Sequence, residues 1–442
     1  MNKIPEIIVN PPGPESQKWH NRATKYMKGY SSQVKMFPVV FEKGEGNTLT
    51  DVDGNTYLDF SSGIYCNSTG HCHPKVVGKI NEYAGKIMNC HDFTTPIKTL
   101  FLEKIASLLP GSLNGIQLFC GGSEAIEAAM RAVRSVKEGK YEMFSFWGDW
   151  HGKTSASISL SSLGNTMFGP RSTGCHLSAT PNCYRCPFKL SYPSCHLVCM
   201  EVLEKTIDNE GTGAQAAVIM EPIQGYSGSV VYQDEILPRI AEICKKRNML
   251  LVADEILTGM GRTGKMFCVE HCNVIPDIIV FGKGAAGGFP LSGFAIKEEY
   301  NWALEKMSAS TTYGGNPMAC AAAYATLEVF EEENILDNVN KVGAFIMNKL
   351  KIMKEEHKII GDVRGKGLLL AIELVKDKNT KEPFPEAGRM VYKKAFSKGL
   401  AWIPAENILR LAPALIITES LAAKALEIIN ESIFETEKHF GY

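Results

Sequence analysis

Lys283 follows a run of apolar residues in the segment PDIIVFGKGAAGGFP, and glycines flank it on both sides. Glycine would let the backbone and a ligand approach each other closely at this point. Burial at the end of a strand disfavours the charged ammonium, so a lysine held there tends to lose its proton. A neutral amine can form a Schiff base with an aldehyde, which makes Lys283 a candidate covalent catalyst. A surface lysine in a glycine-rich loop is the alternative reading.

Asp254 ends a second apolar run, in the segment NMLLVADEILTG. Aspartate is rarely buried without a partner, because an unpaired carboxylate is costly to remove from water. A protonated ring nitrogen is one suitable partner, and a cofactor with a pyridine ring would supply it. An aspartate that caps the following loop is the alternative.

A third pattern, FCGGSEAIEAAMRAV, places Gly121, Gly122 and Ser123 between an apolar run and a strongly helical segment. We expect Ser123 at the N-cap of this helix, since serine is favoured there. Backbone N–H groups, the helix dipole and the serine hydroxyl together suit an anion such as phosphate. Many helices begin in this way, so the pattern is weak by itself.

Short apolar runs alternate with helical patterns between about residues 70 and 325, with expected strands at 115–119, 216–220, 248–254 and 277–281. This alternation predicts an α/β domain with a mostly parallel sheet covered on both faces. Ligands of such sheets lie beyond the carboxyl ends of the strands. Residues 120–123, Glu221, Asp254 and Lys283 are therefore expected at one edge.

The two ends of the chain have a different pattern. Residues 1–35 are polar and irregular, and 36–60 is rich in β-type sequence around a turn at Asp53-Gly54. After about residue 326 we expect one long helix, a strand at 367–374, a second helix, a strand at 407–412 and a helix from Thr418. We predict a large domain at 70–325 and a smaller α+β domain assembled from 1–69 and 326–442.

The composition excludes several classes of protein. Lys and Arg total 47 and Asp and Glu total 48, which gives no support for a nucleic-acid partner. The chain has 45% hydrophobic residues, too many for disorder, and no apolar run approaches the roughly 20 residues of a membrane span. The 13 cysteines are odd in number and mostly scattered, which favours a reducing compartment. We expect a soluble, cytoplasmic protein.

The chain resembles the class III (ω-amino acid) aminotransferases from about residue 36 to 435. The resemblance rests on ordered blocks: DVDGNTYLDFSSG, GHCHPKV, GGSEAIEAAMR, WHGKT, EPIQG, DEILTGMGRTG, FGKGAAGGFP, TTYGGNPMACAAA and NILRLAPAL. It implies the α/β fold type I of transferases that depend on pyridoxal 5'-phosphate (PLP). It also implies an amino donor, a 2-oxo acid acceptor and a homodimer with shared active sites.

The resemblance implies a role for each matching residue at the cofactor. Lys283 would form the Schiff base and move the substrate proton, and Asp254 would pair with the pyridine nitrogen. Ile256 and Trp150 would cover the two faces of the ring. The phosphate would be held by Gly122 and Ser123, with Thr312 reaching the phosphate of the neighbouring subunit.

At the substrate end, the resemblance implies that Arg410 binds a carboxylate through its bidentate fork. Tyr65 falls in the segment that lines the substrate mouth of this family, so we expect substrate contact there, with packing as the alternative.

Three positions depart from the pattern of many family members. Where this chain has Tyr226, those members have a glutamate that masks the substrate-binding arginine. Where it has Lys153, they have an arginine that holds the distal carboxylate of the substrate. Where it has Leu257, they have a glutamine that forms a hydrogen bond with the cofactor. Strict glutamate chemistry is therefore in doubt, and pyruvate as acceptor becomes an option; neutral drift is the alternative.

The expected donors are 4-aminobutyrate, β-alanine, taurine or 5-aminovalerate. An amino-acid racemase or epimerase on the same fold is the alternative, with Tyr226 as candidate for its second acid. A non-catalytic relative would require loss of Lys283 or Asp254, and both are present.

The segment 175–199 has Cys183-x2-Cys186, Cys195 and Cys199. These ligand types suit zinc or an iron–sulfur cluster, whereas the interspersed prolines suit a surface excursion. We assign no metal site.

Overall fold

The computed structural model describes residues 4–162, 169–305 and 310–442. The chain forms two compact units, of which one joins residues 1–74 with 337–442 and the other comprises 75–336. Within the described ranges, no helix combines the length and the apolar character that crossing a membrane requires.

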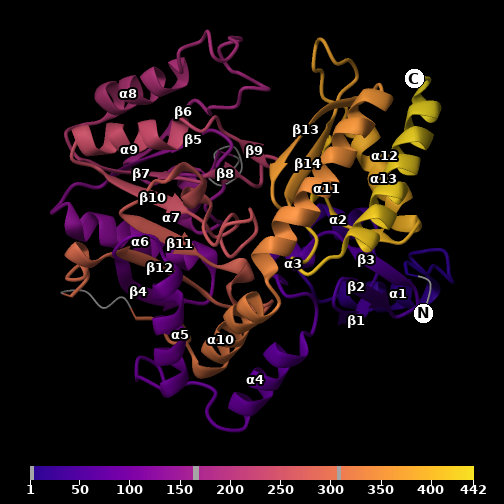
Figure 1. Ribbon diagram of the computed structural model, residues 1–442, viewed down its shortest axis with the longest axis horizontal. Coiled ribbons are helices and arrows are strands. Elements are labelled where there is room, and N and C mark those ends of the chain that lie inside the picture. The colour runs from indigo at the N-terminus through magenta and orange to yellow at the C-terminus, as the bar shows by residue number, and fades with distance from the viewer. Residues whose placement is uncertain (1–3, 163–168, 306–309) are drawn as a thin grey trace. The chain divides into compact units, whose positions relative to one another are not determined.

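A seven-stranded sheet in the order β4-β12-β11-β10-β7-β5-β6 is the core of the second unit (Figure 1). The neighbours β11, β10, β7, β5 and β6 run parallel, whereas β12 is antiparallel to both β11 and β4. The predicted mostly parallel sheet is confirmed. The strands are β4 (Leu113–Phe119), β5 (Glu142–Phe146), β6 (Cys175–Ser178), β7 (Gln215–Met220), β10 (Leu250–Asp254), β11 (Ile278–Phe281) and β12 (Ser292–Lys297).

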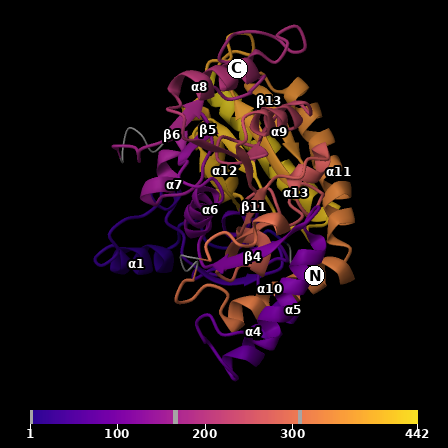
Figure 2. The same ribbon diagram turned by 90° about the vertical axis from the view of Figure 1, so that its left-hand side faces the viewer.

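Small residues let helix α6 pack closely against this sheet. Its inward face includes Ala125, Ala128, Ala129 and Ala132, all fully buried, and it contacts β4, β11 and β12. Helices α8 and α9 pack on each other and on β6, β7 and β10, and α7 lies beside α6 in both views (Figure 2). The helices of this unit include α5 (Pro96–Leu108), α6 (Gly122–Val136), α7 (Ser155–Ser159), α8 (Val198–Glu210), α9 (Ile236–Lys246) and α10 (Pro317–Glu332). Helix α4 (Pro74–Ala84) begins at the last residue before this unit.

The first unit interleaves the two ends of the chain. Strand β15 (Leu400–Ala401) pairs parallel with β3 (Thr56–Asp59), which extends the antiparallel strands β1 (Phe41–Glu45) and β2 (Thr48–Asp51). A second sheet has the order β13-β14-β17-β16, comprising β13 (Ile360–Lys366), β14 (Leu369–Leu374), β17 (Ile408–Leu411) and β16 (Ile403–Ala405). The longer helices of the first unit are α11 (Ile335–Glu356), α12 (Pro385–Ser397) and α13 (Glu419–Phe440). The smaller α+β part is therefore built from both ends, as expected.

Three local expectations were wrong. The N-terminal segment is not irregular throughout, because α1 (Pro14–Ala23), which starts with a proline, and α2 (Ser32–Met36) form there. Two helices, α10 and α11, occupy 317–356 instead of one, and the break falls at Asn334, whose φ is +50°. The N-cap of α6 is Gly121, not Ser123, since Glu124 Oε2 accepts from the Gly121 and Cys120 N–H groups at 2.9 and 3.1 Å.

Candidate active site

The carboxyl ends of the parallel strands bring the predicted residues of the second unit together. Asp254 ends β10 in register with Val280 of β11, and Lys283 follows β11 after Gly282. Met220 of β7 pairs with Ala253 of β10, which places Glu221 beside Asp254 at the same edge. Parallel register therefore sets an amine and two acids on adjacent strand ends, as expected for a ligand site of an open α/β sheet.

Lys283 adopts an unusual backbone conformation. Its φ is +44°, in the left-handed region, and it opens the short 3-10 helix η3 (Lys283–Ala286). Strained residues of this kind persist where the surrounding structure determines them, and they cluster at functional sites. A Cβ placed on Gly282 would lie 3.5 Å from Ile256 Cγ2, so this turn runs directly beside Ile256.

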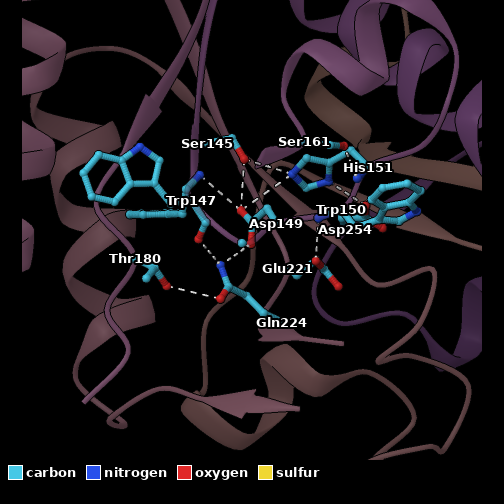
Figure 3. Close-up of polar contacts among 12 residues, drawn as sticks. Ser145, Trp147, Asp149, Trp150, His151, Ser161, Thr180, Glu221, Gln224 and Asp254 are labelled. Carbon is cyan, nitrogen blue, oxygen red and sulfur yellow. Dashed lines mark hydrogen bonds and ion pairs between the residues drawn. The ribbon is translucent and has the colours of Figure 1, made fainter. Parts of the chain in front are cut away.

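Asp254 is held by a buried histidine that sequence reasoning missed. Its Oδ2 lies 2.7 Å from His151 Nδ1, and its Oδ1 accepts from the Ile256 N–H at 3.1 Å (Figure 3). Ser145 Oγ donates to Asp149 Oδ2 and lies 2.9 Å from His151 Nε2. With the serine hydrogen directed at Asp149, both ring nitrogens of His151 act as donors, which is the imidazolium form.

The electrostatics agree with this assignment. Burial by itself would lower the pKa of His151, but the hydrogen bonds and charges of Asp149 and Asp254 outweigh it and raise the pKa to about 10. Burial, together with the charges of Asp149 and Asp254, raises the pKa of the Glu221 carboxyl. Two carboxylates around one imidazolium leave a net negative charge, so the cluster favours a further cation beside Asp254.

The helix that begins at Gly122 forms a second part of the site. A Cβ on Gly122 would lie 3.0 Å from Ile256 Cδ1, and one on Gly152 would lie 2.2 Å from Ser123 Oγ. The Lys153 N–H donates to Ser123 Oγ at 3.1 Å. Ser123 is therefore not the cap of the helix but a link between its first turn and the loop that carries Trp150.

Trp150 lies in this loop beside two other predicted residues. Its ring stacks on that of Tyr226, with centroids 4.6 Å apart and planes at 15°, and Lys153 Nζ lies 5.9 Å from the indole centroid. Glu221 Oε1 accepts from the Trp150 N–H at 2.8 Å. The structure thus brings Trp150, Lys153 and Tyr226 together, with Leu257 packed against Gly225 beside them.

The family is decided by a match that spans most of the chain. The family model described as "Aminotransferase class-III" matches residues 29–433. The chain belongs to the class-III aminotransferase family. Enzymes of this family depend on PLP.

Named relatives of this class-III aminotransferase include two kinds of enzyme. It is 35% identical to an alanine/serine racemase of Pyrococcus horikoshii, over 99% of this chain and 94% of the relative. It is also 35% identical to a 5-aminovalerate aminotransferase of Pseudomonas aeruginosa, over 91% and 95%. Among solved structures, an (S)-enantioselective ω-transaminase of Thermomicrobium roseum is 30% identical, with a TM-score of 0.90 over 95% of this chain and 98% of that one.

The residues present in this class-III aminotransferase fit PLP. The cluster around His151 favours a cation at Asp254, which a protonated pyridine nitrogen would supply, and Lys283 on the adjacent strand end offers an amine. The close approach at Gly122 and Gly152 leaves a helix N terminus with a serine hydroxyl for the phosphate.

The remaining predicted residues are Arg410, Tyr65 and Thr312. Arg410 on β17 and Tyr65, whose φ is +66°, are buried and belong to the first unit. Thr312 is exposed in the second unit, and its carbonyl accepts from Asn89 Nδ2 at 3.0 Å. His151 and Asp149 were missed, although WHGKT contains a histidine whose burial next to an acid could have been suspected.

The four clustered cysteines line one small pocket together with Gln233 and with Ile236, the first residue of α9. Among residues 4–162, 169–305 and 310–442, no three or more His, Cys, Asp or Glu side chains gather closely enough to hold a metal ion.

We predict that His151 keeps its proton well above neutral pH. The imidazole nitrogens should be protonated at pH 8.5, whereas an exposed histidine would be neutral. Because the folded pKa of about 10 exceeds the ordinary 6.5, this group stabilises the fold fully below pH 6.5, and its contribution is lost as the pH rises through 10. Nitrogen-15 NMR of labelled histidines measures this directly.

The matched variants are His151→Asn and Ser145→Ala. Removing the histidine leaves Asp149 and Asp254 buried together and should cost about 3–5 kcal/mol of unfolding free energy. Ser145→Ala removes only hydrogen bonds and should cost about 1 kcal/mol. A histidine signal that is lost in His151→Asn but titrates near pH 6.5 in the wild type would contradict the imidazolium.

Proposed function

We propose that this protein transfers the amino group of an ω-amino acid to a 2-oxo acid, with PLP bound at Lys283. The observation that carries the proposal is the placement of Lys283 and Asp254 on adjacent parallel strand ends, with Asp254 held by a buried imidazolium. The similarity to a 5-aminovalerate aminotransferase supports donors of the 4-aminobutyrate, β-alanine, taurine or 5-aminovalerate type. A cytoplasmic location stays a prediction from composition.

Bound PLP would supply an aldehyde that captures amines and a ring that withdraws electrons from the substrate carbon. Lys283 Nζ would hold the cofactor covalently, and once released it would carry a proton between the substrate carbon and the cofactor's C4′ carbon. Asp254 would keep the proton on the ring nitrogen. His151 orients Asp254, because its Nδ1–H donates to Oδ2.

The remaining residues orient the reactants. Ile256 and Trp150 would cover the two faces of the ring, while Gly122 and Ser123 bind the phosphate at the start of α6. This assignment is supported by the close approach of Ile256 to both Gly122 and Gly282.

At the substrate end, we assign Arg410 to a carboxylate of the substrate, with Lys153 and Tyr65 as further contacts. Tyr226 has no carboxylate with which to neutralise Arg410, and Lys153 offers a point charge instead of a bidentate fork. These features favour a small 2-oxo acid such as pyruvate as acceptor.

A racemase is the second candidate, favoured by the 35% identity to an alanine/serine racemase over 99% of the chain. Racemisation uses the same lysine but returns the proton to the α-carbon from the opposite face. It requires a second acid, and the Tyr226 hydroxyl is the candidate from sequence.

We predict a stoichiometric half-reaction when the PLP-loaded enzyme meets a single ω-amino donor without any 2-oxo acid. The visible absorption band of the cofactor should disappear with 4-aminobutyrate, β-alanine, taurine or 5-aminovalerate, because the amino group stays on the cofactor. Pyruvate should then restore the band. Absorption spectra recorded after mixing with one donor at a time measure how much of the cofactor band is lost per active site.

The same experiment tests the racemase. Persistence of the band with every ω-amino donor, while L-alanine or L-serine loses optical activity, would overturn the aminotransferase assignment. D-enantiomers serve as controls, since a racemase approaches the same final mixture from either side.

Lys283→Ala should lower turnover by at least about a thousandfold, because it removes both the covalent attachment and the proton carrier. PLP should still bind, but noncovalently, and borohydride should fix it to the wild type alone. Lys265→Ala, at an exposed lysine, is the matched control and should retain activity. Mass spectrometry that finds the label on any other lysine would refute the assignment.

We further propose a homodimer in which Thr312 reaches the neighbouring subunit's phosphate. Support comes from exposed apolar side chains in two segments, Ile87, Met88 and Phe93 in one and Tyr313 in the other, of which Phe93 is 79% and Tyr313 62% exposed. The hydrogen bond from Asn89 to Thr312 joins the two segments. Patches of exposed large apolar side chains mark interaction sites.

Phe93→Asp should therefore convert the dimer to a monomer and weaken PLP retention, because the charge would be buried in the interface. Sedimentation velocity gives the mass, and dialysis followed by absorption gives the retained cofactor. Tyr26→Asp is the matched control, since Tyr26 is 89% exposed and lies in the first unit. A wild type that sediments as a monomer would overturn the proposal.

A further inference from the structure

We propose that Tyr226 is a positioning residue that acts through Trp150: its ring fixes the plane of the indole, and its hydroxyl takes no part in the reaction. This inference rests on the proposed function, since the plane of Trp150 affects the reaction only when a cofactor ring lies against it. According to this inference, Tyr226 does not act as an acid.

The geometry of the two rings is that of a stacked pair. The centroids are 4.6 Å apart and the planes differ by 15°, within the range of favourable offset aromatic contacts. Tyr226 is 38% exposed and Trp150 is partly buried, so neither ring is fixed by the core alone. Each ring therefore restricts the rotamers of the other.

One buried carboxyl group, that of Glu221, holds the backbones beneath both rings. Glu221 Oε1 accepts from the Trp150 N–H at 2.8 Å, and Glu221 Oε2 accepts from the Gly225 N–H at 3.0 Å. Figure 3 shows Glu221 and Trp150 in this arrangement, with Gln224 nearby. Glu221 is 3% exposed, so these bonds are shielded from water.

Two further bonds join the same segments. Ser227 Oγ donates to the Gly148 carbonyl at 2.6 Å, and Gln224 Nε2 donates to the Trp147 carbonyl at 2.8 Å. Residues 147–150 and 224–227 are thus joined directly by two hydrogen bonds and indirectly through Glu221. The stacked pair therefore rests on two backbone segments that are fixed relative to each other.

Gly225 limits the freedom of Tyr226 still further. A Cβ at Gly225 would lie only 2.5 Å from Leu257 Cδ1, so the backbone just before Tyr226 runs against the loop that follows Asp254. This contact links the position of the tyrosine to the strand that carries the ring-nitrogen partner. A shift of Tyr226 would require movement of Leu257 or of the Glu221 contacts.

The experiment compares Tyr226→Phe, which keeps the ring and removes the hydroxyl, with Tyr226→Leu, which removes the stack. The full-length variants are examined with and without PLP. Near-ultraviolet circular dichroism reports the coupled Trp150 and Tyr226 rings, and visible circular dichroism reports the orientation of the bound cofactor. Tyr26→Leu controls for the loss of an exposed tyrosine, and melting curves verify folding.

We expect Tyr226→Phe to retain the visible dichroism and the tryptophan part of the near-ultraviolet spectrum, and to keep kcat within about threefold, because the ring contact remains. Tyr226→Leu should lose the near-ultraviolet signal of the pair and reduce the visible dichroism. Its kcat should fall about tenfold with a smaller change in KM, as expected when an orienting contact is lost.

Equal defects in Tyr226→Phe and Tyr226→Leu would overturn the proposal, since the hydroxyl would then be required. Wild-type behaviour of Tyr226→Leu in kcat and in visible dichroism would overturn it as well, and would leave the proposed function intact. A wild type that binds no PLP would instead refute the proposed function. In that case, the near-ultraviolet spectra of the wild type and of Tyr226→Leu would still test whether the two rings stack.

Discussion

The pairing of Asp254 with a buried imidazolium is the interaction on which the candidate site depends. Asp254, Asp149 and His151 are each at most 3% exposed, and an unpaired charge at any of the three would be strongly destabilising. The imidazolium fixes the orientation of Asp254 through Nδ1 and that of Asp149 through Ser145 and Nε2. The cluster thereby turns the end of an ordinary buried strand into a fixed partner for a cation.

Several other features of the second unit are extensions of this cluster. Gln224 Nε2 donates to Asp149 Oδ1, which joins the segment after β7 to the loop after β5. Glu221 connects the same two segments through the backbone of Trp150 and Gly225. Buried polar contacts therefore fix the conformation of the loop that bears Trp150. A loop with a fixed conformation suits a site that must hold a ring in a fixed plane.

Substitutions at the site bear on which enzyme of the family this is. At position 226 this chain has a tyrosine instead of the expected glutamate. The tyrosine cannot neutralise an arginine such as Arg410, but its aromatic ring packs on Trp150. The chain is equally similar, at 35% identity, to a racemase and to an aminotransferase. An aromatic contact serves orientation in either enzyme, whereas an acid is needed in only one.

The sequence by itself determined the class of fold, and it predicted most of the residues that are proposed for the candidate site. Short continuous apolar runs that end at Asp254 and just before Lys283 favour buried strands, and parallel strands place their carboxyl ends together. Only the tertiary structure revealed that His151 joins Asp254, that Gly121 and not Ser123 caps α6, and that Tyr226 stacks on Trp150. These contacts join segments up to 103 residues apart in the chain, or depend on a competing local partner such as Glu124. The local sequence pattern governs which residues are buried. Contacts between side chains of distant segments depend on the sheet, which brings those segments together.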